Sequence, residues 1–282
     1  MKPLPLFLIM LVVTAGIAQD QKSDPVSTAI AETALDYADG FYSGAPERME
    51  RAIHPDLNKV SVVKLNPAAK SALQYSTYSG LIEMTRAKLG FRDPEKRNIN
   101  VTVLKTNDNL ASVKLKSAMF NDYLQMVKTD DKWKIVNVLW EPGPETPNLP
   151  PAGEFNLEHE SQWVITVVRN YYEGSFENDV AKVEKSIYPE LRIGQFAKLP
   201  QSGKEFVNRI GSGMILEATR AKLRQIPEDQ RKVDVNILDI TEKMAYLEAI
   251  TPMSVSYLHL AKMDNDWKIV NILSRQNTPP GK

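Results

Sequence analysis

Aromatic side chains recur at matching places in the two halves of this sequence, and rings of this kind could hold a flat or apolar ligand. Tyr42 lies near the end of a helical pattern, while Tyr123, Trp133 and Trp140 belong to strand-like segments. Pockets for small molecules are mostly apolar with a few placed polar groups, which such rings could line. Rings at helical and strand periods also fill cores, and the spacing favours the core.

Asn137 carries a more specific signal, because an amide stands inside the apolar segment that runs from Ile135 to Leu139. Alternation places it on the same strand face as Trp133 and Ile135. An amide without hydrogen bonds there costs roughly 1 to 3 kcal/mol. Asn271 repeats the situation, so each amide either meets a neighbouring backbone group or faces a wet cavity.

His54 is a candidate for acid–base chemistry, because an imidazole before Pro55 could act on a ligand near neutral pH. Capping the C-terminus of the preceding helix is the preferred interpretation. His159 and His259 add no metal-ligand spacing, so neither a metal nor a cofactor is expected.

A catalytic version of the site would need a carboxylate, Asp56 or Asp122, to face Tyr42. Asp122 alternates with Tyr123, so one of the two points away from the cavity. The second half has Ser256 in place of Asp122, so one acid pair cannot serve both halves. The sequence holds no nucleophile elbow or phosphate loop, and catalysis is the less favoured interpretation.

The composition excludes several classes of function. The chain has 282 residues and no cysteine, which rules out disulfides, a thiol nucleophile and a thiolate metal site. Lys plus Arg and Asp plus Glu each total 35, so no net basic field would attract nucleic acid.

The N-terminus has the layout of a secretory signal: Lys2, the apolar run 6–13 and the small residues before position 19. The expected signal peptide is 1–18, too short for the roughly 20 residues of a membrane-spanning helix. We expect a secreted or periplasmic protein with no membrane contact after signal removal.

The sequence contains one domain twice. Residues 83–89 return as 217–223, and residues 133–137 return unchanged as 267–271, both 134 positions further on. Upstream, residues 41–44 match 171–174 at an offset of 130, which predicts a turn four residues longer between the first two helices of the second copy. Five prolines within 141–151 indicate a stiff linker. The expected parts are a first domain (24–140), a Pro-rich linker (141–157) and a second domain (158–276).

Within one copy, the period of the apolar residues changes from helix to strand. Three helices are expected at 25–43, 46–54 and about 79–89, the third with a buried stripe of Leu81, Ile82, Thr85 and Leu89. After Gly90 the residues alternate, and a hairpin turn follows at 129–132. This order predicts an α+β fold with three N-terminal helices packed on a curved antiparallel sheet.

Several of these segments resemble a known family: Phe41-Tyr42-Ser43-Gly44, His54-Pro55-Asp56-Leu57, Glu83-Met84-Thr85-Arg86 and residues 133–140. The family is labelled "putative lumazine-binding", within the nuclear transport factor 2-like superfamily, and the likeness covers nearly all of the first copy. The second copy departs at Tyr188, Ser256 and Ser274. The resemblance implies two tandem cone-shaped α+β barrels, each around a pocket open at one end, joined sheet to sheet as an internal pseudo-dimer.

The expected function is therefore binding of a small apolar or aromatic ligand, or of a protein partner, without catalysis. The alternatives are an isomerase- or hydrolase-like enzyme with a site in the first copy only, and a structural module with filled cones. The residues expected to line the ligand sites are Tyr42, His54, Tyr123, Trp133, Asn137, Tyr172, Tyr188, Tyr257, Trp267 and Asn271.

Overall fold

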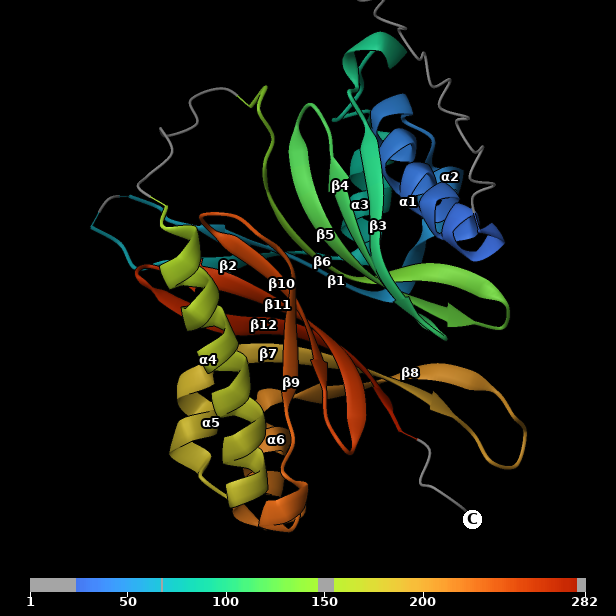
Figure 1. The fold of residues 1–282 in the computed structure, drawn as a ribbon. Coiled ribbons are helices and arrows are strands. Elements are labelled where there is room, and N and C mark those ends of the chain that lie inside the picture. The colour runs from blue at the N-terminus through green and yellow to red at the C-terminus, as the bar shows by residue number, and fades with distance from the viewer. Residues whose placement is uncertain (1–23, 67, 147–154, 278–282) are drawn as a thin grey trace, which may run out of the picture.

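A computed structural model describes residues 24–66, 68–146 and 155–277, which form two α+β domains of the same design (Figure 1). The expected signal peptide and part of the expected linker lie outside the described residues. The first domain comprises α1 (Pro25–Ser43), α2 (Pro46–Ala52), β1 (Ile53–Val63), β2 (Ala72–Ser76), α3 (Tyr78–Arg86), a short 3-10 helix (Pro94–Lys96), β3 (Asn100–Asn107), β4 (Leu110–Lys116), β5 (Phe120–Thr129) and β6 (Lys132–Pro142). The second comprises α4 (Leu157–Glu177), α5 (Val180–Ser186), β7 (Ile187–Lys198), β8 (Glu205–Gly211), α6 (Ser212–Arg220), a short 3-10 helix (Glu228–Gln230), β9 (Asp234–Ile240), β10 (Met244–Ile250), β11 (Ser254–Met263) and β12 (Asp266–Gln276).

The first helix of each domain ends in a left-handed residue, Gly44 with φ 68° in α1 and Asn178 with φ 65° in α4. These two caps are 134 positions apart, and the helices that follow start 134 positions apart as well. The prediction of a longer turn in the second copy is wrong, because the offset stays at 134 through both helices. Tyr171 therefore corresponds to Tyr37, and not to Phe41.

Each domain has a six-stranded sheet, in the order β2-β1-β6-β5-β4-β3 and β8-β7-β12-β11-β10-β9. The expectation of three helices before an antiparallel sheet is wrong in two respects. Two strands intervene between α2 and α3, and β1 runs parallel to β6. Pro55 does not end a helix but lies at the irregular start of β1, where the register shifts between Ile53 and Asn58. Such an irregularity accommodates a residue without an N–H.

The third helix is shorter than expected. It ends at Arg86, so Leu89 lies beyond it and is 66% exposed, while Leu81, Ile82 and Thr85 are buried as predicted. In both domains the helices pack on one face of the curved sheet, and each sheet stays open, with β2 and β3 or β8 and β9 at its edges.

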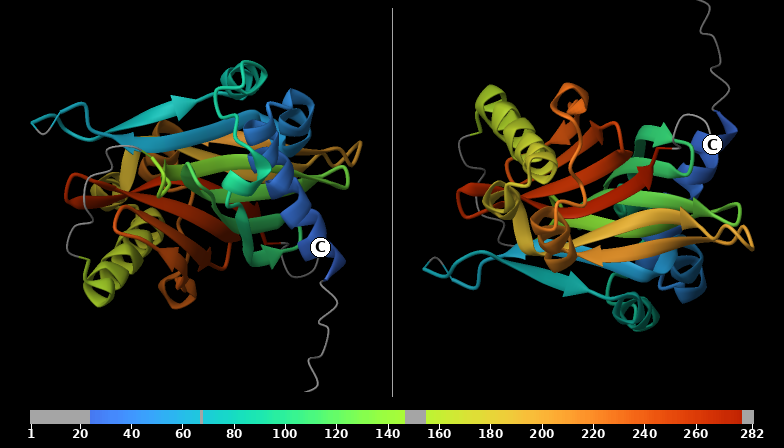
Figure 2. Two further views of the ribbon diagram at one scale, coloured as in Figure 1. Left: turned by 90° about the horizontal axis from the view of Figure 1, so that it is seen from above. Right: turned by 90° about the horizontal axis from the view of Figure 1, so that it is seen from below.

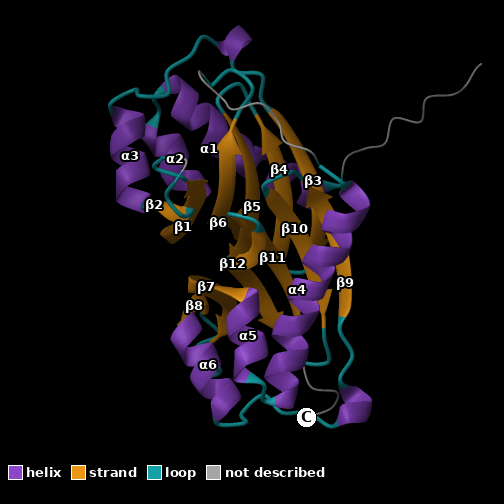
Figure 3. Cartoon of the chain, turned by 90° about the vertical axis from the view of Figure 1, so that its left-hand side faces the viewer, coloured by secondary structure: helices purple, strands orange, loops and turns teal. Residues whose placement is uncertain are grey.

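The opposite faces of the two sheets pack against each other, so the strands lie in the middle and the helices on the outside (Figures 2 and 3). The buried residues of this interface are Val60, Leu110, Tyr123, Val127, Val136, Leu139, Val207, Met244, Tyr246, Tyr257, Ala261, Met263, Val270 and Leu273. Buried hydrogen bonds cross it, among them Asn58 Nδ2 to Asn271 Oδ1 at 2.6 Å and the Tyr246 hydroxyl to the Leu124 carbonyl at 2.8 Å. This packing leaves each concave, helix-covered face free to form a cavity.

Candidate functional site

The first cone encloses a cavity of about 350 Å³ between its helices and its sheet. Most of its lining is apolar or aromatic, and the polar side chains are few. The apolar and aromatic lining residues are Tyr37, Phe41, Met49, Leu81, Met84, Met119, Phe120, Trp140 and Pro142. A cavity of this size and composition is typical of a site for a small, largely apolar molecule.

Lys59 on β1 also lines this cavity, although only 6% of it is exposed to solvent. Its Nζ lies 2.9 Å from Asp122 Oδ1 and donates to the Tyr37 hydroxyl at 2.7 Å. The ring of Trp140 lies 4.8 Å from the ammonium, in cation–π range. An ammonium has three N–H donors, and the described residues accept two of them, so one remains for a ligand.

Burial controls the protonation of this group of side chains. It lowers the pKa of Lys59 and raises that of Asp122, and in each case the oppositely charged partner opposes the shift. Burial, together with the neighbouring Asp122 carboxylate, raises the pKa of Tyr37 well above its ordinary value, so the phenol stays protonated. The second oxygen of Asp122, Oδ2, is buried with no hydrogen-bond partner among the described residues.

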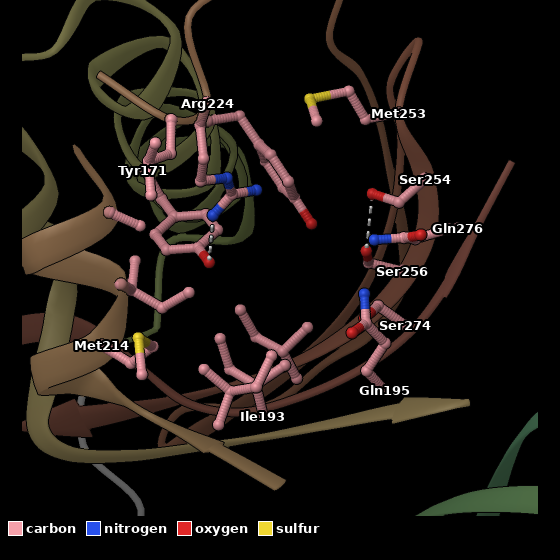
Figure 4. A pocket seen from close by; sticks show the side chains of 16 residues that line it. Tyr171, Ile193, Gln195, Met214, Arg224, Met253, Ser254, Ser256, Ser274 and Gln276 are labelled. Atoms are coloured by element: carbon pink, nitrogen blue, oxygen red, sulfur yellow. Dashed lines mark hydrogen bonds between the residues drawn. The ribbon is translucent and has the colours of Figure 1, made fainter. Parts of the chain in front are cut away.

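The second cone has a cavity of about 300 Å³ with a different character (Figure 4). Ile193 stands at the position of Lys59 and Ser256 at that of Asp122, so the buried ion pair is absent from this cone. The cation here is Arg224, whose Nη1 donates to the Tyr171 hydroxyl at 3.3 Å. Each cone thus has one cation beside the corresponding tyrosine of its first helix.

Of the residues expected to line the sites, the structure places Tyr172 in a cone cavity, that of the second domain. Tyr42 is fully buried behind the wall of the first cavity, where its ring stacks on Phe120 at 5.3 Å. Its hydroxyl donates to Ser117 Oγ and accepts from the Met119 N–H, both at 2.9 Å. Tyr42 therefore supports the wall rather than lining it.

Two tryptophans that were expected at the sites lie elsewhere. Trp133 packs into the first core and lines a shallow hollow on the outside of the domain. Trp267 is fully buried, and its Nε1 donates to Glu160 Oε2 at 2.5 Å.

Five further candidates lie outside both cavities. Tyr123, Asn137, Tyr257 and Asn271 are buried where the two sheets meet, and Tyr188 packs against the same cluster. The prediction that Asn137 shares a face with Ile135 is wrong. Asn137 pairs with Gln125 but Ile135 with Met126, so Val136 is an extra residue that reverses the alternation.

The amides of the interface bond to the opposite domain. Asn137 Oδ1 accepts from Arg209 Nη1 at 2.9 Å, and its Nδ2 donates to Gln125 Oε1 at 2.7 Å. These contacts with side chains of both domains satisfy the buried amide of Asn137. The expected backbone partner contributes only a long bond, from Asn137 Nδ2 to the Ile272 carbonyl at 3.5 Å.

The catalytic arrangement considered from the sequence is not assembled. Asp56 is exposed, and its N–H donates to Nδ1 of His54 at 3.1 Å, outside the cavity. Asp122 points toward the cone and Tyr123 toward the second domain, as alternation predicted. The partner of Asp122 is Lys59, which also donates to Tyr37, and Asp122 bonds to neither Tyr42 nor His54. Within the described residues, no cluster of three or more His, Asp or Glu side chains could hold a metal.

Sequence reasoning missed Lys59, Tyr37 and Arg224. A signal for Lys59 does exist, because it follows Leu57 by two residues and precedes the β-branched run at Val62. A lysine in phase with an apolar residue on a strand must point into the core with a partner. Arg224 lies beyond α6 in irregular chain, where no period predicts its direction.

The fold and the two cavities define the class of this protein: a tandem pair of cone-shaped α+β domains, each with a cavity between helices and sheet. The family described as "Putative lumazine-binding" matches twice, over residues 25–141 and 159–273. The chain belongs to this family.

Several solved structures are similar to single domains of this chain, and three of them are described as proteins of unknown function. A "NTF-2 like protein of unknown function" from Silicibacter pomeroyi is 14% identical, with a TM-score of 0.36, over 42% of this chain and 95% of its own. One from Shewanella baltica is 18% identical, with a TM-score of 0.36, over 42% and 94%. One from Methylobacillus flagellatus is 21% identical, with a TM-score of 0.30, over 43% and 95%. No curated protein matches. Among the described residues, no helix is long and apolar enough to cross a membrane.

Proposed function

We propose that this chain is a secreted tandem-domain protein that binds a small, flat, largely apolar molecule in its first cone and does not transform it. The observation that carries the proposal is Lys59, a buried ammonium with one N–H donor left over, at the wall of a largely apolar cavity. The preferred ligand has an aromatic body for Trp140 and Phe120 and an acceptor, a carbonyl or a carboxylate, for Lys59.

The family description supports this class of ligand. Lumazine is a flat heterocycle with carbonyl acceptors, so its shape and chemistry agree with an aromatic slot beside an ammonium. We propose the class, and lumazine serves as one probe of it.

Binding is tested by calorimetry of the full chain with lumazine, 2-naphthoate and the neutral 2-naphthamide. Charge-assisted hydrogen bonds contribute about 1.5 to 3 kcal/mol, so naphthoate should bind at least about tenfold more tightly than naphthamide. The variant Lys59→Ile/Asp122→Ser should lose this difference, and Lys105→Met, which removes an exposed lysine of β3, should keep it. Equal binding of acid and amide by the natural chain would refute the role of Lys59.

The competing function is an isomerase- or hydrolase-like activity of the first copy. The unpartnered Oδ2 of Asp122 favours it, since an unsatisfied buried carboxylate oxygen could take a proton. Ligands recovered by mass spectrometry after incubation distinguish the two functions. Unchanged ligand supports binding alone, while conversion that Asp122→Asn abolishes supports catalysis.

Secretion is proposed from the signal-like N-terminus. Expression of the full sequence in a bacterial host, followed by N-terminal sequencing of the periplasmic or extracellular fraction, should give a chain that starts near residue 19. Full-length protein in the cytoplasm alone would contradict it.

A further inference from the structure

The cavity of the second cone contains a guanidinium with no acidic partner. Arg224 donates to the Tyr171 hydroxyl at 3.3 Å, and its charged carbon lies 5.7 Å from the centre of the same ring. No carboxylate among the described residues forms an ion pair with it. A guanidinium has five N–H donors in a fixed fork, so most of its hydrogen-bonding capacity is free.

The wall opposite Arg224 is polar. Hydroxyls and amides from three strands face the cavity from that side (Figure 4). They belong to Gln195 on β7, Ser254 and Ser256 on β11, and Ser274 and Gln276 on β12. Isoleucines of the sheet and of α6 line the space between the two polar sides.

Three of the five positions of this wall are aromatic or apolar in the first cone, and the other two are Ser61 and Asp122. Ser254, Ser274 and Gln276 stand 134 positions after Phe120, Trp140 and Pro142, all of which line the first cavity. At these three positions the duplicated framework presents rings and a proline in the first cone and hydrogen-bonding groups in the second.

The cation also stands at a different position in each copy. Arg224 corresponds to Gly90, where even a Cβ atom would lie 2.1 Å from the ring of Phe41. Ser175 stands at the position of Phe41 in the second copy, so this copy has no ring to exclude a side chain there. The exchange of the phenylalanine for a serine is what allows an arginine beside the cavity.

We infer that the second cone is a separate binding site for a small hydroxylated organic carboxylate. The carboxylate would bind the fork of Arg224 and the Tyr171 hydroxyl, the geometry in which arginine pairs best. The hydroxyls of the ligand would bond to the serine and glutamine wall, and its carbon body would contact the isoleucines. This inference rests on the proposed function in one respect: both cones are taken to bind ligands. The ligand class inferred for the second cone differs from that proposed for the first.

The probes are 3,4-dihydroxybenzoate and its neutral analogue 3,4-dihydroxybenzamide, titrated into the full chain by calorimetry. The acid should bind at least about tenfold more tightly than the amide. Arg224→Gln should remove that difference. Arg220→Gln, which removes an exposed arginine of α6 paired with Glu217, is the matched control and should preserve it.

A second variant makes the test independent of Arg224. Ser274→Trp introduces the residue of the first cone into the polar wall and should reduce binding of the acid at least about tenfold by filling the cavity. Failure of the natural chain to bind the acid, equal binding of acid and amide, or full retention of binding in Arg224→Gln would each overturn the inference.

The two sites are separable by experiment. Binding of 2-naphthoate should depend on Lys59 and be unaffected by Arg224→Gln, while binding of 3,4-dihydroxybenzoate should show the reverse. Loss of the first pattern with the second intact refutes the function proposed for the first cone, and the opposite result refutes the site in the second cone.

Discussion

We expect Lys59 and Asp122 to be strongly coupled in their effect on the unfolding free energy. The test replaces this buried ion pair of the first cone by the corresponding residues of the second. The corresponding residues are Ile193 and Ser256, so Lys59→Ile, Asp122→Ser and the double variant form a thermodynamic cycle. Lys59 is 6% and Asp122 1% exposed, and their charged atoms lie 2.9 Å apart. Breaking a buried pair by removal of one partner typically costs about 3 to 5 kcal/mol.

Protonation of Asp122 limits how much unfolding free energy Lys59→Ile can lose. An unpaired buried Asp122 can take up a proton, and from an ordinary pKa of 3.8 this costs about 4.4 kcal/mol at pH 7. In Asp122→Ser, deprotonation of Lys59 limits the loss of unfolding free energy in the same way. Lys59 can lose its proton from an ordinary pKa of 10.5, at about 4.8 kcal/mol. At neutral pH, Lys59→Ile should therefore lose about 3 to 4.4 kcal/mol of unfolding free energy and Asp122→Ser about 3 to 4.8 kcal/mol.

The two single variants should depend on pH with opposite signs. In Lys59→Ile the folded-state pKa of Asp122 is raised, so stability is regained as the pH falls through that value, by about 1.4 kcal/mol per pH unit. In Asp122→Ser the folded-state pKa of Lys59 is lowered, so stability is regained as the pH rises. The double variant should lie within about 1 kcal/mol of the natural chain with neither slope, because neutral residues replace both charges.

The assay is urea unfolding followed by tryptophan fluorescence at about pH 5, 7 and 9. A coupling of about 3 kcal/mol or more between the two sites is the expected result. Losses that simply add in the double variant, or slopes of the same sign in both single variants, would refute the reasoning.

Three further substitutions test the packing around the cones. Gly90→Ala should cost about 1 to 3 kcal/mol, because the new Cβ must displace the ring of Phe41, and an unchanged unfolding midpoint in urea would contradict it. Tyr246→Phe should cost about 0.5 to 1.5 kcal/mol in the same assay, because it removes a buried hydrogen bond to a backbone carbonyl of β5 across the interface. Burial lowers the pKa of His259 well below its ordinary value of 6.5. Its contribution to stability is therefore present above about pH 6.5 and lost as the pH falls, because only the unfolded chain takes up the proton. His259→Gln, which introduces the residue found at Gln125 in the first copy, should flatten this dependence in unfolding measured from about pH 7 to 5, and an unchanged slope would contradict the assignment.

Much of the fold was predictable because the repeat is local and strongly patterned. The helix start at Asp24-Pro25, the stop at Gly44 and the hairpin before Trp133 follow from capping and turn chemistry. β1 was missed because Pro55 is a frequent helix stop. The structure uses it instead at an irregular strand start, which pairs with β6 at Ile53 and whose Ile53 and Leu57 side chains pack into the core.

The site was less predictable, because direction on a strand depends on one residue. The bulge at Val136 turns Asn137 away from the first cone and into the interface, and nothing in the alternation of Ile135 to Leu139 reveals it. Most of the aromatic residues selected from the sequence are buried, as their periodicity predicted. In this fold, however, such residues line two different surfaces: the cavity of each cone and the interface between the two sheets. Tyr123 and Tyr257 serve the contact between the domains, which strand periodicity cannot distinguish from the cavity.

Both copies have a cone with a cation beside a tyrosine, but the cation is Lys59 in the first cone and Arg224 in the second, and the walls around them differ. A tyrosine stays at the same place on the first helix, as Tyr37 and Tyr171, and in each cone its hydroxyl accepts from the local cation. Lys59 needs Asp122 because it is buried on the sheet, whereas Arg224 reaches its cavity from a partly exposed segment and needs no acid. An unpaired cation can offer its full charge to an anion, while a paired one keeps a single donor for an acceptor. The two cones therefore differ in how they would hold a carboxylate: the first with the one remaining donor of a paired ammonium, the second with an unpaired guanidinium, although the framework around them is the same.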